Sequence, residues 1–229
     1  MTITTTTLTR TAGVAAVLAG LLFITVQIGH PHLDVAFATT GEYLVRHVMK
    51  ILVAALSLVG ITGMYLRQVR EVGVLGLLGY VLFSAAYLLL LSVEVIGAVV
   101  LPAIADTSPN YVRDVFAVST GGTAESDIGL IQDLSKLVGF GFIVGGVIFG
   151  IALFRARLLA RWAAALLAVS TAATVLSAVL PQVNFRLFAI PVGIALIGLG
   201  HSLWREQRTA IALPRARAIN AQLDLTGAP

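Results

Sequence analysis

The chain has 229 residues, of which 58% are hydrophobic and only 11% are charged, and its mean hydropathy is +0.97. A soluble domain of this size needs far more polar residues to cover its surface, so the composition predicts an all-α polytopic membrane protein. The net charge of +4 does not indicate nucleic-acid binding, because the basic residues gather in short segments between apolar runs. Cysteine is absent, which excludes disulfides and thiolate chemistry.

Six apolar segments follow one another along the chain, and each is long enough to cross a bilayer as a helix. They cover residues 11–29, 44–66, 72–103, 137–154, 162–180 and 186–204. Ten of the 15 Lys and Arg residues flank the ends of these segments on the side that holds the N-terminus. The positive-inside rule therefore predicts a plasma-membrane protein with six transmembrane helices and both termini in the cytoplasm. Residues 1–205 form the predicted bundle, and residues 206–229 form a basic cytoplasmic tail.

The longest polar stretch joins the third and fourth apolar segments, and it is expected to form a lid over the outer end of the bundle (residues 104–136). Tyr111, Val112, Val115 and Phe116 recur at helical spacing, which predicts a short helix with an apolar stripe on one face. Arg113 and Asp114 are expected to point away from that face. Loops of this length are often functional. The alternative is a disordered external loop, because residues 119–126 are small and polar.

Glu94 is the one ionisable residue in the apolar run from Val72 to Ala105. A carboxylate in such a run is costly unless it faces protein or water, so it marks a candidate site. At ~1.5 Å per residue, Arg46 lies at about the depth of Glu94, and Lys50 lies somewhat deeper. We expect a cation of the second segment to pair with Glu94, and the depth match favours Arg46 over Lys50. The pair is either structural or tunes Glu94 as a proton or cation site.

Polar side chains from most of the apolar segments fall near the depth of Glu94, and this outer layer is the candidate binding site. The candidate ligand- or ion-binding residues are Glu94, Arg46, Lys50, His47 and Arg186, and Lys136 is expected in the same layer. The candidate metal ligands are His30, His32 and His47, because divalent metals bind imidazoles and carboxylates. Their spacing contains no His-x-x-x-His helix motif, and the same residues also fit the lipid headgroup region as ordinary polar side chains. No particular cofactor is indicated.

The fourth apolar segment carries two Gly-x-x-x-Gly motifs, formed by Gly141, Gly145, Gly146 and Gly150. This spacing lets helix backbones approach closely, either within the chain or in contact with a second copy or another membrane protein. The expected partners are thus the lipid bilayer and, through this glycine face, a homo-oligomer or a membrane partner.

Three short sequences carry a resemblance to a known group of proteins. They are Arg10-Thr-Ala-Gly13, the run Gly-Ile-Thr-Gly-Met-Tyr-Leu-Arg at 60–67, and the run Arg-Trp-Ala-Ala-Ala-Leu-Leu-Ala at 161–168. With them the chain resembles, over most of residues 10–205, uncharacterised bacterial integral membrane proteins of about this length. The resemblance implies the six-helix topology and carries no activity.

Three functions fit these features. The first is binding or transport of a small molecule or ion at the outer polar layer. The second is a metal-dependent membrane enzyme that uses the His and Glu residues of this layer. The third is a non-catalytic accessory subunit that docks through the glycine face.

Overall fold

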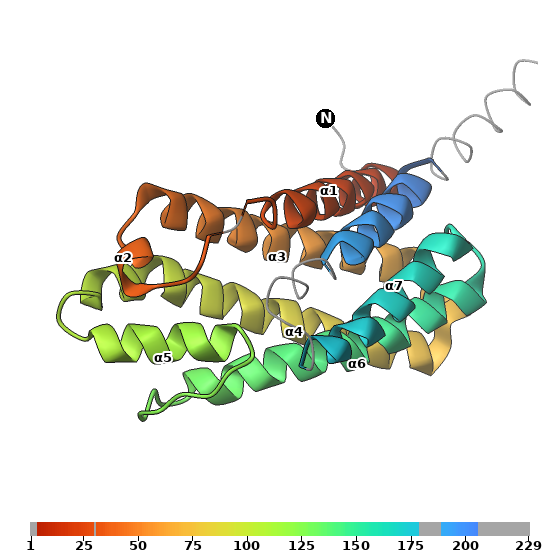
Figure 1. The fold of residues 1–229 in the computed structure, drawn as a ribbon. Helices are drawn as coiled ribbons and strands as arrows, with labels where there is room; N and C mark the ends of the chain where they lie inside the picture. Colours follow the sequence, from red (N-terminus) through yellow and green to blue (C-terminus); the bar gives the residue numbers. More distant parts are fainter. Residues whose placement is uncertain (1–3, 30, 179–188, 206–229) are drawn as a thin grey trace, which may run out of the picture.

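The computed structural model describes residues 4–29, 31–178 and 189–205, which form an all-helical bundle (Figure 1). The helices are α1 (Thr5–Thr25), α2 (Val35–Ala38), α3 (Gly41–Arg67), α4 (Val69–Ile104), α5 (Pro109–Ser119), α6 (Ile131–Ala156), α7 (Arg161–Ala173) and the 3-10 helix η1 (Thr174–Ala178). A further helix covers Ala189–Arg205 and is called the 189–205 helix below. The tail predicted at 206–229 lies outside the described residues.

Four of these helices, α1, α3, α4 and α6, are long and apolar enough to cross a membrane. The fifth and sixth predicted segments correspond to shorter apolar helices: α7, which η1 prolongs, and the 189–205 helix. At 1.5 Å per residue, the described part of the 189–205 helix covers about 25 Å.

Side-chain caps explain where several of the helices begin. Thr4 accepts a hydrogen bond from the Thr7 amide, and α1 starts six residues before the predicted segment. Thr40 caps α3 and Asp34 caps α2 in the same way. Each cap satisfies an amide that the first turn of a helix would leave without a partner. Near the start of α4, Gly73 adopts a positive φ of 57° and kinks the helix.

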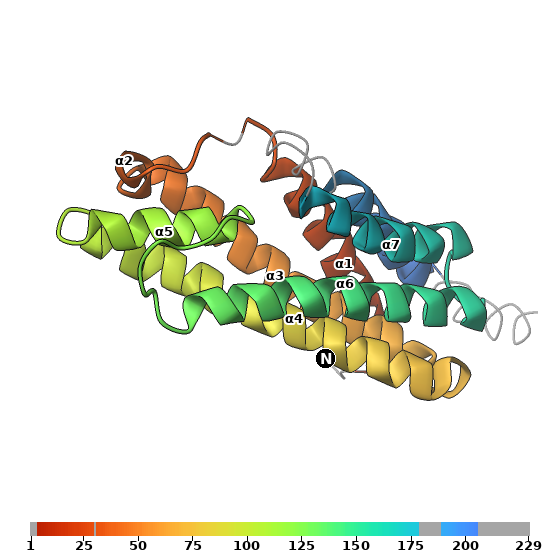
Figure 2. The same cartoon turned by 60° about the horizontal axis from the view of Figure 1, so that its bottom comes forward.

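In the described part of the chain, six helices form a ring in the order α1, α3, α4, α6, α7 and the 189–205 helix (Figures 1 and 2). The 189–205 helix closes this ring. Its Gly198 lies against Trp162 and Ala163 of α7, and its Gly200 lies against Gly13 of α1. Large side chains buried in the centre of the ring include Phe83, Tyr87, Phe149, Leu153, Leu167, Leu196 and Leu199.

Glycine lies at the contact between each pair of neighbours in the ring. A Cβ atom at Gly145 of α6 would collide with the backbone nitrogen of Phe83 in α4. Of the four predicted docking glycines, Gly141 and Gly145 face α4, whereas Gly146 and Gly150 face α7. The Gly-x-x-x-Gly face is thus occupied inside the chain, which is the first of the two arrangements that its spacing allows.

Both views place α2 and α5 at one end of the bundle, called the α5 end below, and the α6–α7 turn at the other end (Figures 1 and 2). The predicted apolar stripe of α5 packs into a second core with Ala38, Tyr43 and Leu101. Val112, Val115 and Phe116 are buried in this core. The segment between α4 and α6 therefore folds back onto the bundle.

We predict that Gly145→Ala destabilises the protein, because its new methyl group would collide with the α4 backbone, which no side-chain rotation can relieve. Overpacking of this kind costs about 1–3 kcal/mol, which should appear as a lower melting temperature in detergent. Gly139→Ala on the same helix is the matched control, since a Cβ atom there meets nothing within 4 Å. Equal melting temperatures for the two variants would contradict the close packing of α4 and α6.

Candidate functional site

Glu94 lies between α3 and α4 near the α5 end, and two side chains of α3 approach its carboxylate. Lys50 Nζ lies 3.6 Å from Oε1, and His47 Nε2 lies 3.5 Å from Oε2. Only 12% of the Glu94 side chain is exposed, against 25% for Lys50. A charge in such surroundings needs a counter-charge, and Lys50 supplies it. These three residues are called the Glu94 cluster below.

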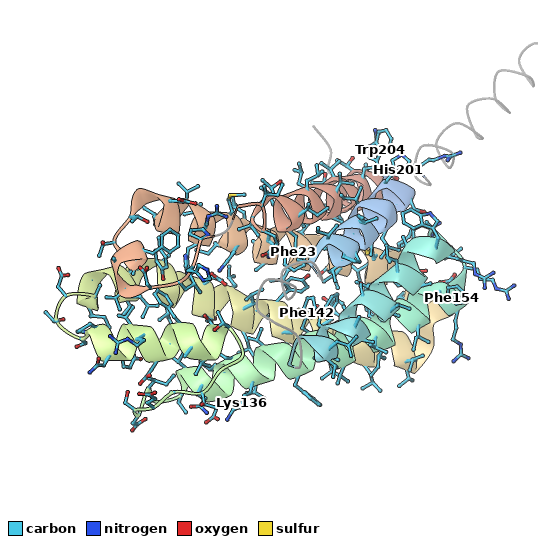
Figure 3. All side chains as sticks on the ribbon, viewed as in Figure 1. Phe23, Lys136, Phe142, Phe154, His201 and Trp204 are labelled. Carbon is cyan, nitrogen blue, oxygen red and sulfur yellow. The ribbon has the colours of Figure 1, made fainter. Side chains whose placement is uncertain are left out.

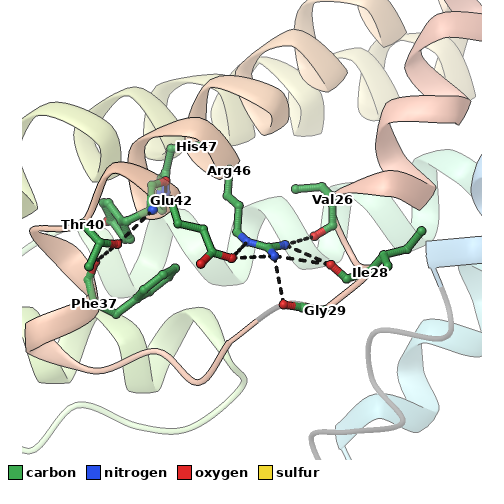
Figure 4. Close-up of polar contacts among 9 residues, drawn as sticks. Val26, Ile28, Gly29, Phe37, Thr40, Glu42, Arg46 and His47 are labelled. Atoms are coloured by element: carbon green, nitrogen blue, oxygen red, sulfur yellow. Dashed lines mark hydrogen bonds and ion pairs between the residues drawn. The ribbon is translucent and has the colours of Figure 1, made fainter.

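The prediction that Arg46 rather than Lys50 pairs with Glu94 is wrong. Arg46 instead donates hydrogen bonds to the Glu42 carboxylate at 2.7 and 2.9 Å. It also donates to the carbonyls of Val26, Ile28 and Gly29 just beyond α1 (Figure 4). These carbonyls follow the last turn of α1 and have no helical partner, so a guanidinium satisfies them well. Arg46 thus faces α1, whereas Lys50 faces Glu94.

The position of the His47 ring is set by a contact with a carbonyl of its own helix and by the space that a glycine of α4 leaves for it. Its ring Nδ1 lies 3.0 Å from the Tyr43 carbonyl oxygen. The Tyr43 hydroxyl donates a hydrogen bond of 2.9 Å to the Gly97 carbonyl and so ties α3 to α4. A Cβ atom at Gly97 would lie 2.9 Å from the imidazole, so the absence of a side chain there lets His47 reach Glu94.

Two cavities meet at the Glu94 cluster. The smaller one, of about 50 Å³, lies beneath Val115 and Phe116 of α5 and is lined by all three residues of the cluster. A cavity of this size has room for one or two water molecules.

The larger cavity, of about 370 Å³, is lined by Lys50 and Glu94 at its polar end. Its walls are mostly apolar and come from α1, α3, α4, α6 and the start of the 189–205 helix. Phe23 of α1 and Phe142 of α6 face the space between these two helices (Figure 3). Thr174 of η1 and Ala189 of the 189–205 helix also line it. The cavity is therefore bordered by side chains from most helices of the ring, with Lys50 and Glu94 at its polar end.

The Asp114 carboxylate binds the loop that follows α5. The prediction that Asp114 points away from the bundle is therefore wrong. Its buried carboxylate accepts hydrogen bonds from the Ser126 hydroxyl, the Ser126 amide at 2.9 Å and the Glu125 amide at 3.3 Å. These hydrogen bonds hold the pKa of Asp114 below its usual value, and the bond from the Ser126 hydroxyl contributes most. The stability they contribute is present above the ordinary aspartate pKa and is lost as the pH falls through the lowered one.

The remaining candidate residues do not join the cluster in the described structure. Lys136 is exposed and pairs with Asp133 on its own helix at 3.8 Å (Figure 3). His30 and Arg186 lie outside the described residues. His32 is described, but no three His, Asp or Glu side chains gather as metal ligands among the residues that the structure describes.

Sequence reasoning identified Glu94 and both cations of α3, but it missed Gly97 and Tyr43, which position His47. One available signal was spacing: Tyr43, His47 and Lys50 recur at intervals of four and three and so share one face of α3. Arg46, three residues after Tyr43 and four before Lys50, fits the same spacing, so spacing alone did not separate it from Lys50.

Comparison with known proteins gives no relative from which a function could be inferred. No family model matches the chain, and no curated protein and no solved structure matches it. The class that the structure defines is an all-helical protein with four helices able to span a membrane, and its function is argued below from the site.

We predict that Glu94→Ala lowers thermal stability in detergent more than Glu94→Gln does. The alanine leaves the Lys50 ammonium partly buried without a counter-charge, and breaking a buried pair in this way costs about 3 kcal/mol or more. Glutamine keeps an oxygen that can accept from Lys50. The double variant Glu94→Ala/Lys50→Met should recover part of the loss, whereas Glu71→Ala, at an exposed carboxylate, should have little effect. A fully stable Glu94→Ala protein would show that the pair is unimportant.

Proposed function

We propose that this protein is a six-span membrane protein that binds, and carries, a small molecule in the larger cavity. The ligand has an apolar body and one polar group, which lies at the Glu94 cluster. The observation that carries the proposal is a cavity of about 370 Å³ with apolar walls and a half-buried charge pair at one end. Binding sites for small molecules combine these features: an apolar surface provides affinity, and a few polar groups fix orientation.

The chemistry of the cluster favours a polar group that donates hydrogen bonds. Oε2 of Glu94 is buried and makes no hydrogen bond in the described structure. The hydroxyls of Ser119 and Thr120, which also line the cavity, already donate to backbone carbonyls of α5. All three side chains therefore present oxygen acceptors, and an amine is the simplest group that complements them.

In the proposed topology, α7 and the 189–205 helix cross the membrane as the fifth and sixth spans. Their place in the ring between α6 and α1 supports this, because the ring would otherwise be open to lipid along one side. The positive-inside rule puts the α5 end outside the cell and both termini inside. The accessory-subunit alternative loses its expected docking surface, since the glycine face packs on α4 and α7.

The binding proposal can be tested with a photoactivatable ligand. A diazirine-bearing dodecylamine, irradiated with the protein in nanodiscs, should label peptides that contain Phe23 and Phe142, which face the cavity. Gly139→Leu should reduce this labelling by about tenfold. Gly139 lines the cavity and a Cβ atom there meets nothing within 4 Å, so the leucine fills the space without disturbing the packing.

Gly41→Leu is the matched control, because a Cβ atom at Gly41 also meets nothing within 4 Å and Gly41 does not line the cavity. It should label like the wild type. Equal labelling of all three proteins would refute binding in this cavity.

The topology can be tested separately, because the chain contains no cysteine. In intact cells, a membrane-impermeant maleimide should label Glu125→Cys in the loop after α5. Arg157→Cys in the α6–α7 turn and Thr226→Cys near the end of the chain should react only after permeabilisation. Glu125 and Arg157 are exposed, so access within the protein does not limit either reaction. If Thr226→Cys reacts in intact cells, the proposed arrangement of the last span is wrong.

A further inference from the structure

The hydrogen-bond polarity of His47 is fixed by its backbone partner. Ring Nδ1 lies 3.0 Å from the Tyr43 carbonyl oxygen. A carbonyl oxygen only accepts hydrogen bonds, so Nδ1 must carry a hydrogen whether the imidazole is neutral or charged. In the neutral ring the other nitrogen, Nε2, therefore has a lone pair and no hydrogen.

This lone pair faces an acceptor. Nε2 lies 3.5 Å from Oε2 of Glu94, and that oxygen is buried without a hydrogen-bond partner. When His47 is neutral and Glu94 is ionised, two acceptors thus face each other with no hydrogen between them. One added proton, on either atom, converts this unfavourable contact into a hydrogen bond.

The other groups around Glu94 are compatible with one additional proton. The titratable groups that face Glu94 all come from α3: Tyr43, His47 and Lys50. Lys50 occupies the opposite oxygen, Oε1, and the Tyr43 hydroxyl donates to Gly97. From α1, α5, α6 and the 189–205 helix, the described residues that line the two cavities are all uncharged. Oε2 and Nε2 are thus the free acceptors of the cluster.

We propose that Glu94 and His47 bind one exchangeable proton between them, and that this proton competes with the donor group of the cavity ligand. This inference rests on the proposed function and names its coupling ion. Proton and ammonium each bring one positive charge and N–H or O–H donation to the same pair of acceptors, so only one of them occupies the site at a time. Such competition is the elementary requirement for exchanging a proton for a ligand across a membrane.

The proton site is tested first without any ligand. Infrared difference spectra of the protein in nanodiscs, recorded between acidic and alkaline pH, should show a protonated carboxylic-acid band at low pH. Glu94→Gln should remove this band, and Glu71→Gln, at an exposed carboxylate, should leave it in place. The proposal is overturned if acidification produces neither a carboxylic-acid band that depends on Glu94 nor hydrogen on Nε2 of His47, which the next measurement detects.

A second measurement does not depend on altering Glu94. In a variant that keeps His47 alone of the four histidines, nitrogen NMR reports which ring nitrogen carries hydrogen. At alkaline pH we expect the tautomer with hydrogen on Nδ1 and a bare Nε2. Hydrogen on Nε2 in the neutral ring would mean that His47 already donates to Glu94, and the proton site would be excluded.

Competition is tested with the diazirine-bearing dodecylamine, which stays cationic across the range because an alkylamine titrates near the lysine pKa. Below the midpoint of proton binding, its apparent affinity should fall about tenfold per pH unit, as expected for competition with one proton. Labelling by the matching diazirine-bearing dodecyl alcohol methyl ether, which has no donor, should not vary with pH. Glu94→Gln should remove the pH dependence of amine labelling.

The outcomes separate the two proposals. If the amine labels the cavity equally at every pH, the ligand site stands and the competition with a proton is refuted. If neither probe labels the cavity, the ligand site fails, and the infrared and NMR measurements still decide whether Glu94 and His47 hold a proton.

Discussion

Close backbone contact at glycine is the constraint on which the rest of this structure depends. Every pair of neighbours in the ring meets where at least one helix lacks a side chain, as Gly60 and Gly63 of α3 do against Ala16 and Ala12 of α1. Between apolar helices in lipid there is little hydrophobic gain from association, so van der Waals contact at short range must hold the bundle together. These contacts also fix how each helix is rotated about its axis, because a glycine must face its neighbour.

The rotation of α3 and α4 has a chemical consequence. Once Gly97 faces α3, the Tyr43 and His47 side chains can approach α4 closely, and Lys50, one turn further along, reaches the same side. Glu94 then has a counter-charge and an imidazole within 3.6 Å. Arg46 is turned toward α1, where it stabilises the exposed carbonyls after the helix. The rotation of α3 about its axis thus decides that Lys50 pairs with Glu94 and that Arg46 binds the carbonyls after α1.

The larger cavity brings residues from distant parts of the chain together. Phe23 of α1, Phe142 of α6 and Val192 of the 189–205 helix line its apolar walls. Lys50 and Glu94 line its polar end, which gives this half-buried charge pair access to a space large enough for a ligand.

The sequence by itself determined the helical class and the approximate limits of the apolar helices. Hydropathy and the constant rise of a helix are local properties, so they identified Glu94, predicted a cation of α3 as its partner and revealed the apolar stripe of α5. Only the tertiary structure decided which cation pairs with Glu94, that Asp114 turns inward to Ser126 and that the Gly-x-x-x-Gly face is used inside the chain. Those outcomes depend on the direction in which a side chain leaves its helix relative to its neighbours, and that direction is set by contacts between residues far apart in the sequence.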